Sequence, residues 1–116
     1  MKTSLVIILS HVILTNFALA QNGKIKIDVG EQYTGIAITI IENKTEIETV
    51  YADSAGKAEF KSILRGNYDL KFTTKEGFII IKKITIAWNK ILFIEPDLYN
   101  LPNEISYKKY LALKRK

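Results

Sequence analysis

The chain lacks cysteine, and its only histidine and only methionine are His11 and Met1. A chain without cysteine forms no disulfide and has no thiolate to serve as a nucleophile or a metal ligand. Both His11 and Met1 lie in a segment that is predicted to be removed after export. The mature chain would then contain none of the three residue types, which excludes Ser-His triads, imidazole zinc sites and haem ligation.

Residues 1–20 have the pattern of a signal peptide. Lys2 gives a positive start, Leu5–Leu14 is an apolar stretch, and Ala18-Leu19-Ala20 places small residues where a signal peptidase reads them. Cleavage is predicted before Gln21. The alternative is a membrane anchor, but Leu5–Ala20 spans only 16 residues, whereas a transmembrane helix needs about 20. We expect an exported bacterial protein that is periplasmic, outer-membrane-associated or secreted, and no cysteine is present for lipoprotein acylation.

Positive charge is concentrated at the C-terminus. The chain has 17 basic and 12 acidic residues, a net charge of +5, and loss of Lys2 would leave +4. Residues 21–107 carry only −1, because five basic side chains lie in the last nine residues: Lys108, Lys109, Lys114, Arg115 and Lys116. Nucleic-acid binding needs a basic face across the domain, so we expect no nucleic-acid partner. The tail is expected to contact an anionic membrane surface or an acidic partner.

Residues 23–95 alternate between apolar and polar positions with the period of two that is typical of strands, and turn residues interrupt them at short intervals. The pattern predicts seven strands, at 24–29, 36–41, 46–51, 57–61, 68–72, 78–86 and 91–94. Seven short strands without a helical period predict an all-β domain over residues 21–97, folded as a Greek-key sandwich of two sheets. Pro96 is expected to end the last strand.

Residues 98–116 are interpreted as a basic C-terminal tail. Asn100–Glu104 is typical of a helix start, because a proline and an acidic residue fall in the first turn. Residues 105–116 would follow either as a short helix or as a frayed terminus, and their apolar residues do not form a clean stripe. Because seven strands are complete by Glu95, we expect the fold to survive removal of the residues beyond Glu104.

Turn residues stand at three characteristic places along the strands. Asp53 can accept a backbone N–H two residues further on, and Gly56 and Gly66 can adopt positive φ angles. Tyr68 can plug the core from the following strand. The segments that hold these residues and the strand before them are 35–40, 51–60 and 63–70.

These segments resemble the carboxypeptidase regulatory-like family. Its transthyretin-like (prealbumin-like) β-sandwich domains are common in exported proteins of Bacteroidetes-type bacteria. The similarity covers about residues 23–95 and rests on Asp53, Gly56, Gly66 and Tyr68. It departs from the family pattern where Arg65 replaces a frequent proline and where Tyr51-Ala52 replaces a frequent threonine.

The resemblance implies a transthyretin-like or immunoglobulin-like sandwich and an accessory role. In metallocarboxypeptidases this module follows a separate zinc-binding catalytic domain, for which this chain has neither the length nor a mature histidine. The acidic residues are scattered singly, and neither a calcium loop nor a glycine-rich phosphate cradle is present. We therefore predict a protein that is not an enzyme and uses no metal or cofactor.

Four aromatic residues are candidates for stacking on a sugar ring: Tyr33, Tyr51, Phe78 and Trp88. Tyr51 and Phe78 fall on alternating strand positions, so core packing is the favoured interpretation for both. Trp88 lies in a predicted loop, Ala87–Lys90, where it is either a lid on the end of the sandwich or a contact residue.

Two functions of different class follow as hypotheses. The first is a non-enzymatic accessory module of the bacterial envelope, which binds a protein or a surface partner through a sheet edge or through loops at one end. The second is a carbohydrate-binding module, in which Trp88 and a neighbouring tyrosine such as Tyr33 stack on a sugar ring.

Overall fold

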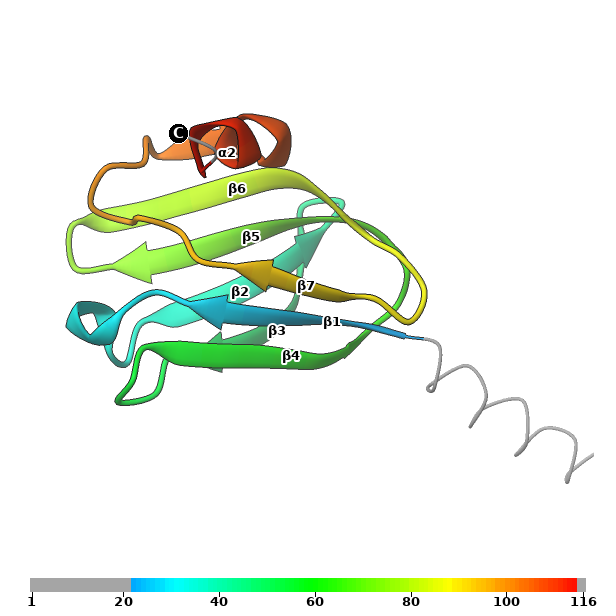
Figure 1. Ribbon diagram of the computed structural model, residues 1–116, viewed down its shortest axis with the longest axis horizontal. Helices are drawn as coiled ribbons and strands as arrows, with labels where there is room; N and C mark the ends of the chain where they lie inside the picture. The colour runs from blue at the N-terminus through cyan, green and yellow to red at the C-terminus, as the bar shows by residue number, and fades with distance from the viewer. Residues whose placement is uncertain (1–21, 115–116) are drawn as a thin grey trace, which may run out of the picture.

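The protein folds as two β-sheets packed into a sandwich, with one short helix near the C-terminus (Figure 1). The computed structural model describes residues 22–114, so the predicted signal peptide, Arg115 and Lys116 lie outside the described residues. One sheet has the strand order β4-β1-β7 and the other β3-β2-β5-β6-β8. The predicted two-sheet sandwich is therefore confirmed.

The elements are β1 (Gly23–Asp28), a 3₁₀ helix (Glu31–Tyr33), β2 (Ala37–Glu42), β3 (Thr45–Tyr51), β4 (Lys57–Ile63), β5 (Gly66–Thr74), β6 (Gly77–Ile86), β7 (Ile91–Ile94), β8 (Glu104–Ser106) and α2 (Tyr107–Lys114).

Alternation of apolar and charged side chains explains which face of a strand turns inward. In β1, Ile25 and Ile27 are buried whereas Lys24 and Lys26 are exposed. The same period places apolar side chains from both sheets between the layers. Removing these side chains from water is the main favourable contribution to folding. The largest fully buried side chains are Phe60, Phe72, Ile25, Ile38, Ile40, Leu70, Ile81, Ile84 and Ile94.

The C-terminal segment completes the second sheet, which corrects two expectations. β8 pairs in parallel with β6, and the register sets Ile105 beside Ile81. Ile105 and Tyr110 are buried in the same core as the strands. The described chain therefore has eight strands rather than seven, and the sheet does not end at Pro96. Removal of the residues beyond Glu104 would take Ile105 and Tyr110 out of the core, so the fold is not expected to survive it.

The C-terminal helix begins later than the sequence pattern suggested. Ser106 precedes α2, and its Oγ accepts the backbone N–H of Lys109 at 3.2 Å, as an N-cap residue does. Tyr110 is buried, and Tyr107 and Leu111 are partly buried against the core. The tail is therefore a packed helix, and the predicted helix start at Asn100–Glu104 is wrong, because that segment is a turn followed by β8.

The strand order differs from that of an immunoglobulin sandwich. There the first strand shares a sheet with the second, fourth and fifth strands. Here β1 pairs with β4 in antiparallel and with β7 in parallel, while β2 lies in the other sheet. The immunoglobulin-like alternative is therefore wrong. Among residues 22–114, no helix is both long enough and apolar enough to cross a membrane.

A bulge in β6 changes which of its residues face inward. Lys83 has a φ of 62°, and its backbone N–H donates to Asp69 Oδ1 at 3.1 Å. Odd-numbered isoleucines are buried before the bulge and even-numbered ones after it: Ile79, Ile81, Ile84 and Ile86. The extra residue at Lys83 thus keeps both halves of this long strand apolar on the inner face.

Two aromatic residues that were expected in the core lie on the surface. Phe78 is 48% exposed, because Ile79 takes the inward position at the start of β6. Tyr51 is 67% exposed at the end of β3, a strand whose residues are nearly all accessible. In an alternating strand the inward parity is fixed by the pairing register, which the sequence alone did not reveal.

Candidate functional site

The turn between β3 and β4 is organised by Asp53. Its Oδ1 accepts the backbone N–H groups of Ala55 and Lys57, each at 2.9 Å. Gly56 has a φ of 79°, and a Cβ at this position would overlap the backbone of Gly30. In return, Gly56 O accepts the N–H of Val29 at 2.8 Å. Asp53 therefore fixes the turn itself, and Gly56 lets the turn pack closely against the loop that follows β1.

The turn between β4 and β5 is held by Tyr68. Its hydroxyl donates to Leu64 O at 2.6 Å, and the ring is buried. A tyrosine that bonds a carbonyl a few residues upstream braces a sandwich corner. Gly66 has a φ of 157°, a positive value that residues with a side chain rarely adopt, so the expected positive φ is confirmed at this turn as it is at Gly56.

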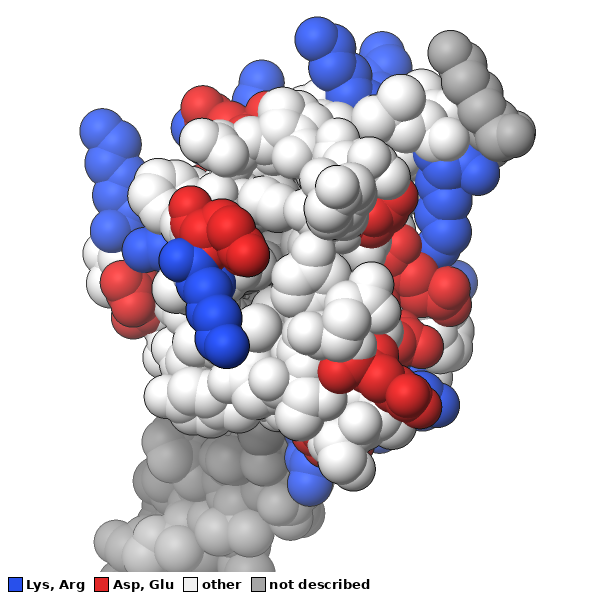
Figure 2. Space-filling view, turned by 90° about the vertical axis from the view of Figure 1, so that its left-hand side faces the viewer, with Lys and Arg blue, Asp and Glu red and all other residues white. Residues whose placement is uncertain are grey.

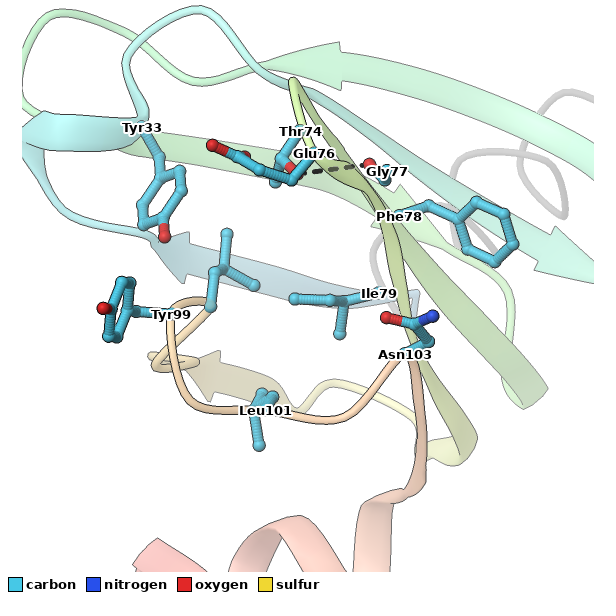
Figure 3. Close-up of a pocket in the computed structure, with 10 residues that line it drawn as sticks. Tyr33, Thr74, Glu76, Gly77, Phe78, Ile79, Tyr99, Leu101 and Asn103 are labelled. Atoms are coloured by element: carbon cyan, nitrogen blue, oxygen red, sulfur yellow. Dashed lines mark hydrogen bonds between the residues drawn. The ribbon is translucent and has the colours of Figure 1, made fainter.

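A pocket of about 280 Å³ lies at the end of the sandwich where β5 turns into β6 (Figure 3). Its walls come from the 3₁₀ helix, the β5–β6 turn and the loop between β7 and β8. Buried Ile79 and Leu98 form part of the lining. The remaining lining residues are Tyr33, Thr74, Glu76, Gly77, Phe78, Tyr99, Leu101 and Asn103.

The close-up shows how the aromatic and polar groups lie around this pocket. Tyr33 and Tyr99 lie on the same side, and the Glu76 carboxylate points toward Tyr33, whereas Phe78 turns away at the opposite rim (Figure 3). The Asn103 carboxamide lies near Ile79. The pocket thus offers aromatic surface, one carboxylate and one amide to a ligand.

The loop that carries Tyr99 is braced by its own residues. Asp97 O accepts the N–H groups of Asn100 and Leu101, and Asp97 Oδ2 accepts Asn100 Nδ2–H at 2.6 Å. Asn103 O accepts the N–H of Ile80 at 2.8 Å, which fastens the loop to β6. Tyr99 is 82% exposed on this fixed loop, so its ring is presented to solvent with little backbone freedom.

Trp88 lies at the other end of the sandwich. β5 runs from Gly66 to Thr74, which separates the two ends by about 27 Å at 3.4 Å per residue. Trp88 is 50% exposed, and the Arg65 guanidinium lies 4.3 Å from the centre of its ring. Arg65 and Trp88 border a hollow of about 430 Å³ that no tyrosine lines. The structure therefore does not bring Trp88 and Tyr33 together.

The segments that connect strands have opposite charge at the two ends. At the pocket end, residues 29–36, 52–56, 75–76 and 95–103 include five acidic residues and one basic residue. At the other end, residues 43–44, 64–65 and 87–90 include three basic residues and no acidic residue. Figure 2 shows a largely uncharged centre on the pocket end, with both acidic and basic side chains around it.

Within residues 22–114, no three histidine, cysteine, aspartate or glutamate side chains are grouped so as to hold a metal ion. Glu76 is the one carboxylate in the pocket lining, and acid–base catalysis of glycoside cleavage uses a pair of carboxylates. The arrangement can bind a ligand by stacking and hydrogen bonding.

Sequence reasoning found Tyr33 and missed Tyr99, Glu76 and Asn103. Tyr99 lay in the segment assigned to the tail, so it was not considered as a surface aromatic. The available signal was its place in a loop beside Pro96 and Pro102, where an aromatic residue has no strand face on which to be buried. The basic residues Lys108, Lys109 and Lys114 lie on α2, away from this pocket.

No protein-family model and no curated protein match the chain. Among solved structures, it is similar to a crystal structure described as "a putative carbohydrate binding protein from Bacteroides uniformis", with 18% sequence identity and a TM-score of 0.47. The alignment covers 65% of this chain and 41% of that one, so the chain spans less than half the length of this neighbour.

Proposed function

We propose that the protein is a non-enzymatic binding module of the bacterial envelope, which holds a neutral sugar residue in the pocket between Tyr33, Tyr99 and Asn103. The observation that carries this proposal is the exposed ring of Tyr99 on a braced loop, beside a second tyrosine and two hydrogen-bonding side chains. Relative to the sequence-based hypothesis, the sugar site moves from Trp88 to the opposite end.

The chemistry of a sugar suits this lining. A pyranose ring has a C–H face that packs on an aromatic ring, and its hydroxyl groups donate to carboxylates and accept from amides. Ligand pockets enclose roughly 300–1,000 Å³, so this one, at about 280 Å³, has room for a single ring with the neighbouring units outside. We infer recognition of one unit at the end or on the side of a glycan chain.

The charge of the pocket end selects the class of sugar. Glu76 lines the pocket, and Glu31, Asp53, Glu95 and Asp97 lie in the loops of the same end. An anionic sugar such as a uronic acid would approach like charges, which lowers its affinity. A neutral or amino sugar is therefore the expected ligand.

The family resemblance and the predicted export remain part of the proposal. Asp53, Gly56 and Tyr68, which carry the resemblance, make turn contacts in the structure. This supports the proposed Greek-key, carboxypeptidase regulatory-like assignment and its accessory role. A signal peptide ending at Ala20 would bring the module to extracellular or periplasmic glycans, and an intact-mass measurement of the exported protein tests that cleavage.

A glycan array followed by calorimetry tests the sugar proposal. The array should show neutral glycans bound in preference to uronic acid-containing ones. Tyr99→Ala should then weaken binding of the best neutral oligosaccharide about tenfold, because a stacked ring contributes about 1.4 kcal/mol. Since Tyr99 is so exposed, its loss should change the free energy of unfolding by less than about 0.5 kcal/mol.

Two matched aromatic variants are the controls for Tyr99→Ala. Tyr51→Ala removes another exposed tyrosine outside the pocket, and Trp88→Ala removes the ring at the other end. Both should bind the same oligosaccharide as the wild type does. Loss of binding in Trp88→Ala with no change in Tyr99→Ala would return the sugar site to Trp88.

A second candidate function, binding of a protein partner, is favoured by the edge strand β7. Among the described strands β7 pairs only with β1, and it exposes Ile91 and Phe93 without carrying a charged residue. Such an edge can accept a strand from a partner, and natural edges are commonly protected by charge. Phe93→Lys separates the two functions, because it should block strand addition and leave glycan binding unchanged.

A further inference from the structure

A second hollow lies where α2 crosses the edge of the larger sheet. It encloses about 640 Å³ between β6, β8 and α2. The β6–β8 register sets Lys82 beside Ser106, so the strand lysines and the start of the helix lie next to each other. This groove does not share a residue with the sugar pocket. Its lining residues are Lys82, Lys83, Pro102, Glu104, Ile105, Ser106, Lys109, Ala112 and Leu113.

The charge of the groove is positive. Lys82 pairs with Glu104, so these two charges compensate each other. Lys83 and Lys109 are exposed and make no ion pair with any residue among 22–114. The lining thus holds three lysines against one carboxylate, and Asp69 beside Lys83 is engaged by the Lys83 backbone N–H, so the groove keeps an excess of positive charge for an anion.

Apart from Ser106, the uncharged residues of the lining are apolar. Leu113 is 52% exposed, although the other large apolar residues of α2 are buried or partly buried against the core. Leu113 follows Lys109 by four residues, so both side chains lie on the same face of the helix. An exposed leucine and alanine beside two free ammonium groups match a ligand with an anionic group next to hydrocarbon.

We propose that this groove docks the protein on a membrane surface by binding an anionic phospholipid. Lys83 and Lys109 contact the headgroup phosphate, and Leu113 reaches the hydrocarbon boundary. Lys108 and Lys114 of the same helix add attraction to an anionic surface, but the groove locates the contact on one face of the folded domain. The charge count had assigned the membrane contact to the C-terminal tail. In this proposal the contact also involves Lys83 on β6.

Vesicle sedimentation with the full chain tests this proposal, using phosphatidylcholine vesicles with and without phosphatidylglycerol. The double variant Lys83→Ala/Lys109→Ala should weaken binding to the anionic vesicles about thirtyfold, because each lysine near such a surface contributes about 1 kcal/mol. Leu113→Gln should weaken binding a few-fold. The decrease should shrink as salt shortens the screening length.

The matched control is Lys24→Ala/Lys61→Ala, which removes the same charge from exposed positions on the smaller sheet. It should change vesicle binding less than twofold.

Equal loss in the two double variants would overturn the proposal in favour of nonspecific attraction. Full competition by inorganic phosphate at constant ionic strength, or no effect of Leu113→Gln, would show a phosphate site without lipid contact and would also overturn it. Glycan binding should be unchanged in all of these variants, so the two proposals can fail separately.

Discussion

The two ends of the sandwich each carry an exposed aromatic residue in a loop, but the side chains around the two rings differ. At the acidic end, Tyr99 projects from a loop braced by Asp97 and leaves its ring free beside a pocket. At the basic end, the guanidinium of Arg65 stands over the ring of Trp88. The cation covers one face of the ring, so that face is not available to stack on a sugar.

The difference teaches that exposure alone does not identify a binding aromatic. Trp88 was the more conspicuous residue in the sequence, because tryptophan is rare and the loop was easy to predict. Its neighbour Arg65 came from another turn, 23 positions earlier in the numbering, and only the fold brings the two together. The side chains packed on an aromatic ring therefore decide its role.

The largest expected effect compares the turn glycines of the two ends. Gly56→Ala at the pocket end should lower the free energy of unfolding by about 3 kcal/mol or more, since φ is 79° and the new Cβ would overlap the Gly30 backbone. Gly66→Ala at the other end should cost less, about 1–2 kcal/mol, because its φ of 157° strains a side chain but the nearest neighbours lie 3.5 Å or more away. Urea unfolding measures both. Equal costs would show that the two turns are equally strained.

The next effect concerns Tyr110, which joins α2 to the pocket end. Its hydroxyl oxygen accepts the N–H of Glu95, the first residue of the loop that carries Tyr99. Tyr110→Ala should cost about 3 kcal/mol because it empties a buried position. Tyr110→Phe should cost about 1 kcal/mol and lower glycan affinity a few-fold by loosening the loop. Thermal melts and calorimetry measure these values, and unchanged stability in Tyr110→Ala would mean that α2 is not part of the core.

A smaller and pH-dependent effect belongs to Tyr68 at the basic end. Burial, with a contribution from the Glu42 charge, raises the pKa of Tyr68 above its usual value of 10.0. The unfolded chain therefore ionises first, so the stability from Tyr68 is complete below about pH 10 and is lost as the pH rises through the folded pKa.

The test of this pH effect is Tyr68→Phe, which also removes the hydrogen bond to Leu64 O and should cost about 1 kcal/mol at pH 7. The stability difference from the wild type should shrink above pH 10. Asp53→Ala is the control at the other end, because it removes turn hydrogen bonds and leaves Tyr68 in place, so its cost should not follow the same pH dependence. A constant difference for Tyr68→Phe up to pH 11 would contradict the assigned pKa direction.

The smallest effect is expected for Arg65→Ala. An exposed cation–aromatic contact contributes about 0.5–1 kcal/mol, so the midpoint of unfolding should shift only slightly. Trp88 is the only tryptophan, so its fluorescence reports this end alone and should change in the variant. Glycan binding at the other end should stay the same. An emission spectrum identical to that of the wild type would mean that Arg65 does not cover the ring.

Much of the fold could be predicted because most of its strands alternate locally. The alternating positions of Ile25 and Ile27 predict the inner face of β1. The polar residues Asn43 and Lys44 between two strand-forming segments predict the turn that the structure has there. β8 could not be predicted, because three residues do not establish a period and its partner β6 lies about 24 positions earlier. Parallel pairing over that separation is a tertiary property.

The candidate site was only partly predictable for the same reason. Tyr33 could be chosen from its residue type, but its neighbours Tyr99 and Asn103 come from a loop that is far away in the chain. Phe78 was assigned to the core because one shift in strand parity exchanges inside and outside. Residue type thus indicated the chemistry, while the composition of the site depended on how the loops meet.

The parallel contacts of β7 with β1 and of β8 with β6 have a consequence for the order of folding. The first strand can pair with β4, but its other edge must wait for residues 91–94, and the larger sheet and the core remain open until Ile105 and Tyr110 have been made. Such long sequence separations slow folding and leave apolar strands unpaired while the chain is incomplete. A chain crossing a membrane from its N-terminus would therefore remain unfolded almost until its last residues emerge. For the export that we propose, this architecture would keep the polypeptide unfolded during transport and let it fold at its destination.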